Sequence, residues 1–519
     1  MITKSRKKLK IDTFFRRPTY ANEYLWLFFL GFVVSLLGMV FTQAEEMGVF
    51  ITVSSLIGKG YSLYAEVFDI KDPLFFYSLA VVQKLFGITG IFVFDSILTA
   101  ITLPLAYAIG LKLKLTKHAS FFSSLLFFLT LTGDFGNSLR SQILGIVFLL
   151  LLILNLLERR WFSVGVYLTL IFFAKMPMLV VALFAVFPIL FFKFRIQLLS
   201  KLFLGIGASA AVITLLLQVR GELAGYIEMV IENFIYASNY QVIVGQREGI
   251  LGHFAIWNGT ELRFVSFLIV LIVILLFRRS ITPKYFELFS LCLAINVGTS
   301  IYLLSTAMWS HHLQIISLYI LFDLMTLMAI FESSNTNLVQ KSNKFIKVLP
   351  SSQGRLDIRV CVTFFAIIAL ISNSGLALPL KSEMPISSYF SHSWTKPVEI
   401  SMLEEAGQVL PLGGSFARFG MNEDMGFGAF LESNWELKCS RFMMGGSESI
   451  HTIKKYLNCI ETTPDVILTA PFYISQKNRS GNYSYYYAQS QRILNDLFEC
   501  RPGPFDGYNY CLRKNLAKD

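Results

Sequence analysis

Residues 24–42, YLWLFFLGFVVSLLGMVFT, form an uninterrupted apolar run about as long as an α-helix must be to cross the hydrocarbon core of a bilayer. A strongly basic stretch, MITKSRKKLKIDTFFRRP, precedes it at residues 1–18. The run is too long for the core of a signal peptide, and it ends without a small-residue cleavage site. The sequence therefore predicts a retained first membrane span with the N-terminus in the cytoplasm.

Apolar runs of this kind recur through the first 380 residues. Of the 519 residues, 54% are hydrophobic and 15% are charged, whereas charged residues make up about a quarter of a typical soluble protein. We therefore expect a polytopic α-helical membrane protein with about eleven transmembrane helices. The predicted spans are residues 24–42, 91–111, 119–132, 142–157, 162–174, 176–192, 202–219, 264–277, 285–307, 313–331 and 360–379.

A further apolar run, residues 73–86, is too short for a straight span and is interrupted by Gln83 and Lys84. If it crossed the bilayer, the basic cluster at residues 112–117 and nearly every later basic cluster would face outward, against the positive-inside rule. We therefore expect residues 73–86 to form an interfacial helix on the outer surface. This topology places four segments outside, namely residues 43–72, 133–141, 220–263 and the chain after about residue 380.

The net charge of +11 comes from short basic clusters between apolar runs, so membrane lipids are expected as partners and nucleic acid is not. Two outer stretches, residues 47–60 and 226–240, have the apolar spacing of helices that lie along a membrane. For the second stretch, an ordinary loop helix that covers the bundle is an equal alternative. Lys175 and Pro177 break one long apolar segment into two short helices, and residues 332–353 have the composition of a flexible connector.

The sequence divides into a membrane domain, residues 1–379, and a C-terminal extracytoplasmic domain, residues 380–519. Turn clusters and a strand-like run at residues 465–469 predict a small mixed α/β fold for the second domain. Four cysteines there indicate two disulfides in an oxidising compartment, with four reduced thiols as the alternative. Three pairings are open, and the preferred one closes two short local loops: Cys439 with Cys459, and Cys500 with Cys511.

An acidic pair, Glu45 and Glu46, follows the first span directly, and carboxylates at that depth are costly unless they are used or paired. Further along the same outer segment come Gly60 and Tyr61, then Asp69, Lys71 and Pro73, and then Leu85, Phe86 and Gly87. In order and spacing this segment resembles the GT-C membrane glycosyltransferases, in the branch of protein O-mannosyltransferases and lipid A aminoarabinose transferase. Weaker likenesses lie at Lys175 with Pro177, and at Trp309, His311 and His312.

The resemblance implies a GT-C-like fold and transfer of a sugar from a polyprenyl-phosphate donor to an extracytoplasmic acceptor, with inversion at C1. Such a reaction needs a base for the acceptor and cations for the leaving phosphate. Glu45 is the expected base, Glu46 can share its role, and Asp69 and Tyr61 are further site residues. The expected phosphate contacts are Lys71, Lys175, Arg140, His311 and His312.

Several positions depart from the pattern of the family. Glu45 replaces an aspartate, Asp72 interrupts a Lys-Pro-Pro segment, and Gln142 stands where many relatives carry an acid. The last difference weakens the case for a metal site built from two acids, so no metal ligands are assigned, although a divalent cation (Mg²⁺ or Mn²⁺) stays open as a cofactor.

The rival prediction is an ion- or proton-coupled transporter or a flippase of envelope precursors, because Asp323 lies inside an apolar run. Against it stand the large outer domain and the lack of the paired halves that many transporters show. A noncatalytic subunit of a cell-envelope complex is a third option. The predicted location is the inner or plasma membrane.

Overall fold

The computed structural model describes the chain in thirteen stretches, and the account below is confined to them. They are residues 18–41, 47–68, 71–132, 141–192, 196–243, 285–305, 314–345, 398–409, 414–419, 435–441, 450–469, 482–503 and 509–516.

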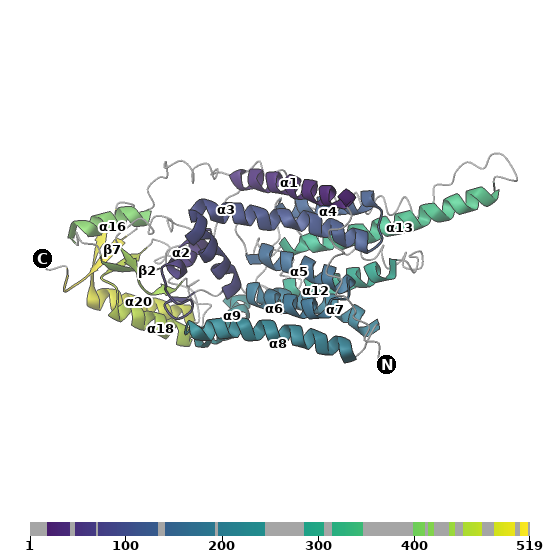
Figure 1. Cartoon of the computed structure of the whole chain (residues 1–519). Helices are drawn as coiled ribbons and strands as arrows, with labels where there is room; N and C mark the ends of the chain where they lie inside the picture. Colours follow the sequence, from purple (N-terminus) through teal and green to yellow (C-terminus); the bar gives the residue numbers. More distant parts are fainter. Residues whose placement is uncertain are drawn as a thin grey trace, which may run out of the picture.

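Most of the described chain is helical, and the strands lie mainly in the C-terminal part (Figure 1). The N-terminal helices are α1 (Pro18–Phe41), α2 (Met47–Gly58), α3 (Pro73–Lys112), α4 (Lys117–Thr132), α5 (Ser141–Leu157), α6 (Trp161–Ala174), the 3-10 turn η1 (Met176–Met178), α7 (Leu179–Phe192), α8 (Ile196–Val219), α9 (Leu223–Ile243), α12 (Phe286–Ser305) and α13 (Ile316–Phe345). The C-terminal part contains α16 (Val398–Val409), α18 (Ile450–Thr462) and α20 (Asn482–Leu497). The strands are β1 (Val67–Phe68), β2 (Ser415–Phe419), β3 (Glu436–Leu437), β4 (Ser440–Arg441), β5 (Val466–Thr469), β6 (Phe498–Pro502) and β7 (Asn509–Arg513).

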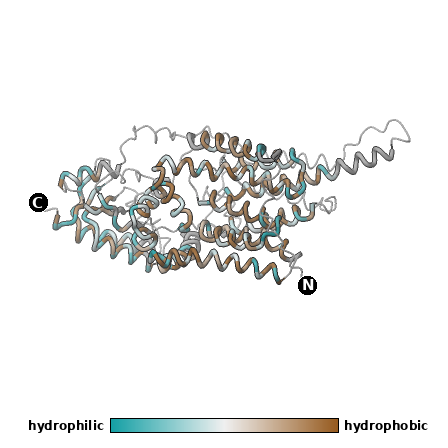
Figure 2. Tube along the Cα trace, viewed as in Figure 1, coloured by the Kyte–Doolittle hydropathy of each residue, from teal (hydrophilic) through white to brown (hydrophobic). Residues whose placement is uncertain are grey.

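Several long apolar helices make this a multi-pass membrane protein. Within the described ranges, four helices are long and apolar enough to cross a membrane: Pro73–Lys112, Ile196–Val219, Phe286–Leu303 and Ile316–Ser333. Shorter apolar helices occupy Asn22–Leu37, Ser141–Leu157, Trp161–Ala174 and Met176–Leu190. Figure 2 shows the hydrophobic residues concentrated in this bundle and a more polar C-terminal part. Two predicted spans, residues 264–277 and 360–379, lie outside the described residues.

Residues 73–86 form the first of two helical stretches within α3, and the two stretches meet at a kink. The helix bends at Gly87, whose φ of 69° and ψ of −168° are not helical. A positive φ is readily adopted by glycine and strained for other residues, so Gly87 allows the chain to change direction between the two helical stretches. α2 packs against this first part, with the rings of Phe50 and Phe75 5.1 Å apart and a bond of 2.5 Å from Ser54 to Gln83.

The prediction of a flexible connector at residues 332–353 is wrong for its first part, because α13 continues as a helix to Phe345. Once a long apolar helix has formed, each further residue adds a hydrogen bond at little extra cost. The stretch from Glu332 to Phe345 holds neither glycine nor proline, so nothing in it stops the helix. Glu332 is also anchored by Tyr285 and by Thr116, each at 2.6 Å.

At one end of the bundle, ion pairs join basic residues at the helix ends to acidic residues of neighbouring segments. Arg159, between α5 and α6, pairs with Glu287 of α12 at 2.5 Å. Glu158, in the same turn, pairs with Lys112 at the end of α3 at 2.7 Å. The first turn of α4 joins this end through Lys117, which pairs with a glutamate of α1 at 2.5 Å. The opposite ends of these helices therefore point toward the second end of the bundle, where the C-terminal part lies (Figure 1).

The C-terminal part is a mixed sheet of five strands in the order β3-β2-β5-β7-β6, with helices on both faces. β2 runs parallel to β3 and β5, whereas β7 is antiparallel to β5 and β6. Side chains alternate across the sheet: Phe416 and Leu512 pack toward α16, and Ala417 and Ile467 pack toward α18 and α20. The predicted mixed fold is confirmed, and the strand-like run at residues 465–469 is β5.

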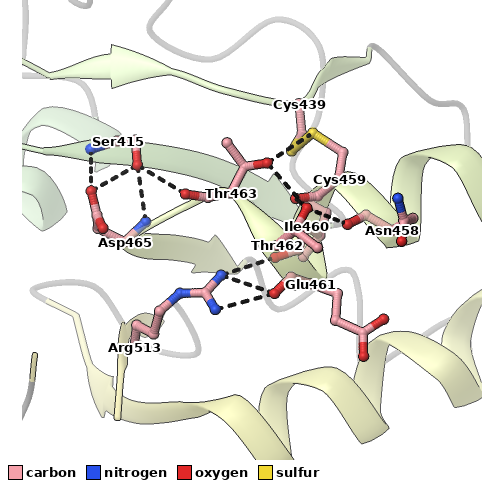
Figure 3. The surroundings of a disulfide bond; sticks show 10 residues. All are labelled: Ser415, Cys439, Asn458, Cys459, Ile460, Glu461, Thr462, Thr463, Asp465 and Arg513. Carbon is pink, nitrogen blue, oxygen red and sulfur yellow. Dashed lines mark hydrogen bonds between the residues drawn. A yellow bond between two sulfur atoms is a disulfide. The ribbon is translucent and has the colours of Figure 1, made fainter. Parts of the chain in front are cut away.

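Two disulfides brace this sheet. Cys439 is bonded to Cys459 of α18, and Cys500 is bonded to Cys511 on the neighbouring strand. This is the pairing that the short local loops predicted. Figure 3 shows the surroundings of the first bond, where Ser415 donates to Asp465 at 2.7 Å and the Arg513 guanidinium donates to backbone carbonyls at the end of α18. A disulfide-bonded domain is consistent with an extracytoplasmic location.

Candidate functional site

The loop between α2 and α3 is held in shape by Tyr64. Its backbone N–H donates to Val67 O at 2.6 Å, and its hydroxyl donates to the carbonyl of Lys71 at 2.7 Å. Tyr64 is buried and takes a φ of 68°, which is uncommon for a residue with a side chain. The loop can pack so closely because Gly225 lies beside it: a Cβ there would be 2.7 Å from the Cβ of Tyr64.

Lys71 is half-buried at the end of this loop. Its Nζ lies 4.9 Å from the centre of the Phe50 ring in α2, which is within the range of a cation–π contact. The bond from Tyr64 fixes the backbone of Lys71, and Phe50 directs its side chain. Lys71 thus has a defined position next to α2, and its role as a cationic site residue stays a prediction.

The α6–α7 break lies against the start of α3. Lys175 ends α6 with a φ of −161°, and η1 follows it. This break frees the N–H of Met176, which donates to Asp72 Oδ2 at 3.0 Å. A single hydrogen bond thus joins segments about 100 residues apart and places Lys71 and Lys175 on adjoining backbones.

Asp72 is buried, with 4% of its surface exposed. Burial raises the pKa of its carboxyl to about 6, although the Met176 N–H and the charge of Lys175 act in the opposite direction. Its second oxygen, Oδ1, has no hydrogen-bond partner in the described part of the chain. The site thus contains a carboxyl with unused acceptor capacity beside a lysine.

Aromatic rings form the wall of the site on the side of α9. The ring of Tyr226 stacks on Phe173 at 5.4 Å and lies 5.7 Å from the ring of Tyr64. Burial, together with the charge of Asp72, raises the pKa of Tyr226 far above its ordinary value. The hydroxyl of Tyr226 is buried and has no hydrogen-bond partner among the described residues.

Glu222 ties this region together. Its fully buried carboxylate accepts hydrogen bonds from Leu63 N at 3.0 Å, from Arg220 Nε at 2.9 Å and from the hydroxyl of Tyr77. The Arg220 guanidinium also lies over the ring of Tyr77, 5.2 Å from its centre. The loop between α2 and α3, the helix α3 and the α8–α9 turn are therefore joined to one another through one carboxylate.

The C-terminal part contacts the same loop. β1 and β4 pair in parallel, with Val67 opposite Ser440. Tyr61 donates to Glu436 at 2.6 Å, and this bond, together with burial, raises the pKa of Tyr61 to about 12. Lys438 bonds to the same carboxylate at 2.7 Å and, with Tyr61, holds the pKa of Glu436 below its ordinary value. Tyr61 therefore acts as a contact between the loop and the C-terminal part.

Of the predicted site residues, the structure describes Lys71, Lys175 and Tyr61. The bond from Met176 to Asp72 places the two lysines on adjoining backbones, whereas Tyr61 contacts Glu436 and Arg220. The remaining ones lie outside the described residues: Glu45, Glu46, Asp69, Arg140, His311 and His312. Within the described ranges, no three His, Cys, Asp or Glu side chains group as a metal site would need. The predicted base and the divalent cation both stay predictions.

Sequence reasoning missed three members of this region, Asp72, Glu222 and Tyr226. Asp72 could have been found from the sequence, because an acid between a lysine and a proline at the start of an apolar helix indicates a candidate site residue. Glu222 and Tyr226 lie in a segment that is predicted to be outside, and no local pattern marks them as neighbours of residues 61–77. Only the tertiary fold shows that they meet.

Asp323, on which the transporter prediction rests, belongs to α13 and contacts α12. It is fully buried, and its Oδ1 accepts hydrogen bonds from Asn296 at 2.9 Å and from Cys292 at 3.2 Å. In the described part of the chain, Oδ2 has no such partner. The Asp323 carboxyl thus acts as a polar link between two packed helices.

No protein-family model matches the sequence, and a search of curated proteins found no match either.

Proposed function

We propose that this chain is a membrane glycosyltransferase that takes its sugar from a polyprenyl-phosphate carrier and transfers it, with inversion at C1, to an extracytoplasmic acceptor. One observation carries the proposal. The bond between Asp72 and Met176 holds Lys71 and Lys175 on adjoining backbones at one end of an apolar bundle. Two cations at the end of a membrane bundle suit the phosphate of a lipid carrier, which approaches from the bilayer.

The reaction assigns a role to each proposed site residue. The acceptor attacks C1, the bond from C1 to the phosphate oxygen breaks, and the negative charge that develops on the leaving phosphate is stabilised by Lys71 and Lys175. Arg140, His311 and His312 complete this phosphate site in the proposal. Glu45, with Glu46 beside it, takes the proton of the acceptor.

The surroundings of the loop support a lipid-linked donor. Four apolar side chains near the bend of α3 are exposed, which suits contact with lipid at the edge of the membrane. They are Val81, Leu85, Phe86 and Ile88. The disulfide-bonded domain, paired with the loop through β1 and β4, would then face the acceptor on the outer side of the inner or plasma membrane, and the N-terminus would be cytoplasmic.

The test incubates the purified protein in lipid nanodiscs with a panel of polyprenyl-phosphate sugars and measures released lipid phosphate. Release from at least one donor is expected. Lys71→Ala should lower kcat/KM by about 10- to 100-fold and raise KM, because a charge-assisted contact to the phosphate is lost in both the ground and transition states. Glu45→Gln should lower kcat by about 10²- to 10⁴-fold and leave donor binding intact, because the amide keeps the shape but cannot accept the proton.

Lys84→Ala is the matched control, because Lys84 is an exposed lysine in the first part of α3, which follows Lys71 in the chain. It should change kcat/KM less than about 2-fold, since an exposed charge contributes little. Absence of lipid-phosphate release from every donor rejects the transferase. Unchanged turnover in both Glu45→Gln and Glu46→Gln removes its catalytic centre and favours the transporter, for which the buried carboxyl of Asp323 is the supporting observation.

A further inference from the structure

Asp72 carries hydrogen-bonding capacity that the fold does not use. Oδ2 is occupied by the N–H of Met176, while Oδ1 is buried without a partner among the described residues. A buried acceptor without a donor costs free energy, typically more when it is charged. Such a group is retained at a cost to the empty protein, which is expected where a ligand supplies the missing donor.

Tyr226 presents a second unused group in the same place. Its ring is fixed between Tyr64 and Phe173, so its hydroxyl cannot turn away to find a partner. Phe173 lies two residues before Lys175 and three before Met176, whose N–H is bonded to Asp72. The two side chains that carry unpartnered oxygens therefore contact the two sides of the α6–α7 break, Asp72 through Met176 and Tyr226 through Phe173.

The charges around these oxygens restrict the ligand. Lys175 stands at the break, and Lys71 precedes Asp72 in the chain. A metal cation would face two lysines, and an anion placed at Asp72 would face a carboxylate. An alcohol suits both oxygens, because its hydroxyl can donate to a carboxylate and accept from a tyrosine.

We propose that Asp72 and Tyr226 form a hydroxyl-binding subsite that takes one ring hydroxyl of the donor sugar, next to the phosphate held by Lys71 and Lys175. This inference rests on the proposed function and deepens it, because it assigns to Asp72 the recognition of the sugar rather than of the carrier. Discrimination at such a site is strong, since an analogue that lacks the hydroxyl leaves the buried groups unpaired.

The test measures equilibrium binding to the protein in nanodiscs. The ligands are polyprenyl-phosphate hexoses, their monodeoxy analogues and polyprenyl monophosphate without a sugar. With the wild-type chain, one deoxy analogue should bind about 10- to 100-fold more weakly than its parent. Asp72→Asn should weaken the parent by a similar factor and leave that analogue and the sugar-free phosphate unchanged. Tyr226→Phe removes only the unpartnered hydroxyl and should likewise weaken binding of the parent donor. It replaces Asp72→Asn in the test if that variant does not fold.

Asp496→Asn and Tyr485→Phe, both in α20, are the matched controls and should leave all affinities unchanged. Equal binding of every deoxy analogue, or an equal loss for all ligands including the sugar-free phosphate, overturns the subsite. Lipid-phosphate release is measured in parallel on the wild-type chain. If a deoxy analogue binds more weakly but no lipid phosphate is released, the transferase is rejected and the subsite is kept. If lipid phosphate is released but all deoxy analogues bind equally, the subsite is rejected and the transferase is kept. If no hexose donor binds, both are rejected.

Discussion

Asp72 is a residue whose ionisation opposes folding. Burial raises its pKa from 3.8 to about 6, against the smaller opposing effects of Met176 and Lys175. The folded protein therefore holds this proton more tightly than the unfolded chain, and between about pH 4 and pH 6 stability falls as the pH rises. A shift of this size corresponds to roughly 3 kcal/mol at neutral pH. A carboxyl kept at such a cost is expected at a functional site rather than at a structural one.

Asp72→Asn should therefore raise the melting temperature at pH 7.5, because the neutral amide escapes the cost of a buried charge. At pH 4 the difference from the wild-type chain should be small, since Asp72 is then mostly protonated. Thermal unfolding in detergent across this pH range measures both values. Asp496→Asn, at an exposed position, is the control and should follow the wild type. If Asp72→Asn instead lowered the melting temperature at pH 7.5, attraction to Lys175 would outweigh burial and Asp72 would be a structural ion-pair partner.

At the scale of single elements, α8 is held to the bundle by a close approach of glycines. A Cβ on Gly165 of α6 would lie 2.1 Å from Leu202 O, and a Cβ on Gly205 of α8 would lie 2.1 Å from Phe162 O. Elsewhere on its surface, α8 exposes large apolar residues such as Phe203 and Leu216. Small residues at a helix contact with apolar residues facing outward are the usual arrangement for a helix at the lipid boundary of a membrane bundle.

Gly205→Ala should therefore lower the stability of the bundle by about 1 to 3 kcal/mol, because the added methyl group forces α6 and α8 apart. Gly207→Ala is the matched control on the same helix, since a Cβ at that position meets nothing within 4 Å. It should be neutral or stabilise the protein by up to about 1 kcal/mol, because alanine favours a helix more than glycine does. Thermal unfolding of the two variants in one detergent makes the comparison. Equal stability of both would show that the α6–α8 contact is loose enough to adjust.

Several elements were readable from the sequence because their signals are local. The break at Lys175 follows from a lysine and a proline inside an apolar run, and both disulfides follow from cysteines that close short loops. The direct succession of the two helical stretches of α3, with Gly87 as the kink between them, was not readable, because a glycine that kinks a helix has the same local signal as one that precedes a loop. The contact of Asp72 with Met176 and the pairing of β1 with β4 depend on segments far apart in the chain, which no local pattern encodes.

At the scale of the whole molecule, the two ends of the bundle differ in kind. One end is built from ion pairs such as Lys112 with Glu158 and Arg159 with Glu287. The other end carries the loop with Lys71, the break at Lys175 and the disulfide-bonded C-terminal part. This separation supports the predicted topology, in which the first part of α3 is an interfacial helix and only its second part crosses the membrane.

Cysteines placed at positions 84 and 114 test this topology with a reagent that cannot cross membranes. Both lysines are exposed, so a cysteine at either position would react if it faced the reagent. Lys84→Cys should be labelled from outside intact cells, whereas Lys114→Cys should be labelled only after the membrane is opened. The wild-type chain measures the background. Labelling of position 114 from outside would show that the topology is the reverse of the predicted one. Lys71 and Lys175 would then face the cytoplasm.

The pairing of β1 with β4 also sets an order of events during synthesis. Val67 leaves the ribosome about 370 residues before its partner Ser440, an interval of tens of seconds at about 5 to 20 residues per second. Throughout that time the loop that ends at Lys71 lacks its strand partner. Ser440 directly follows Cys439, whose bond to Cys459 forms only where oxidation is possible. The loop therefore gains its strand partner only after residues 440–441 have been synthesised. In the predicted topology this also requires export of the C-terminal part, which would couple completion of the loop to protein export.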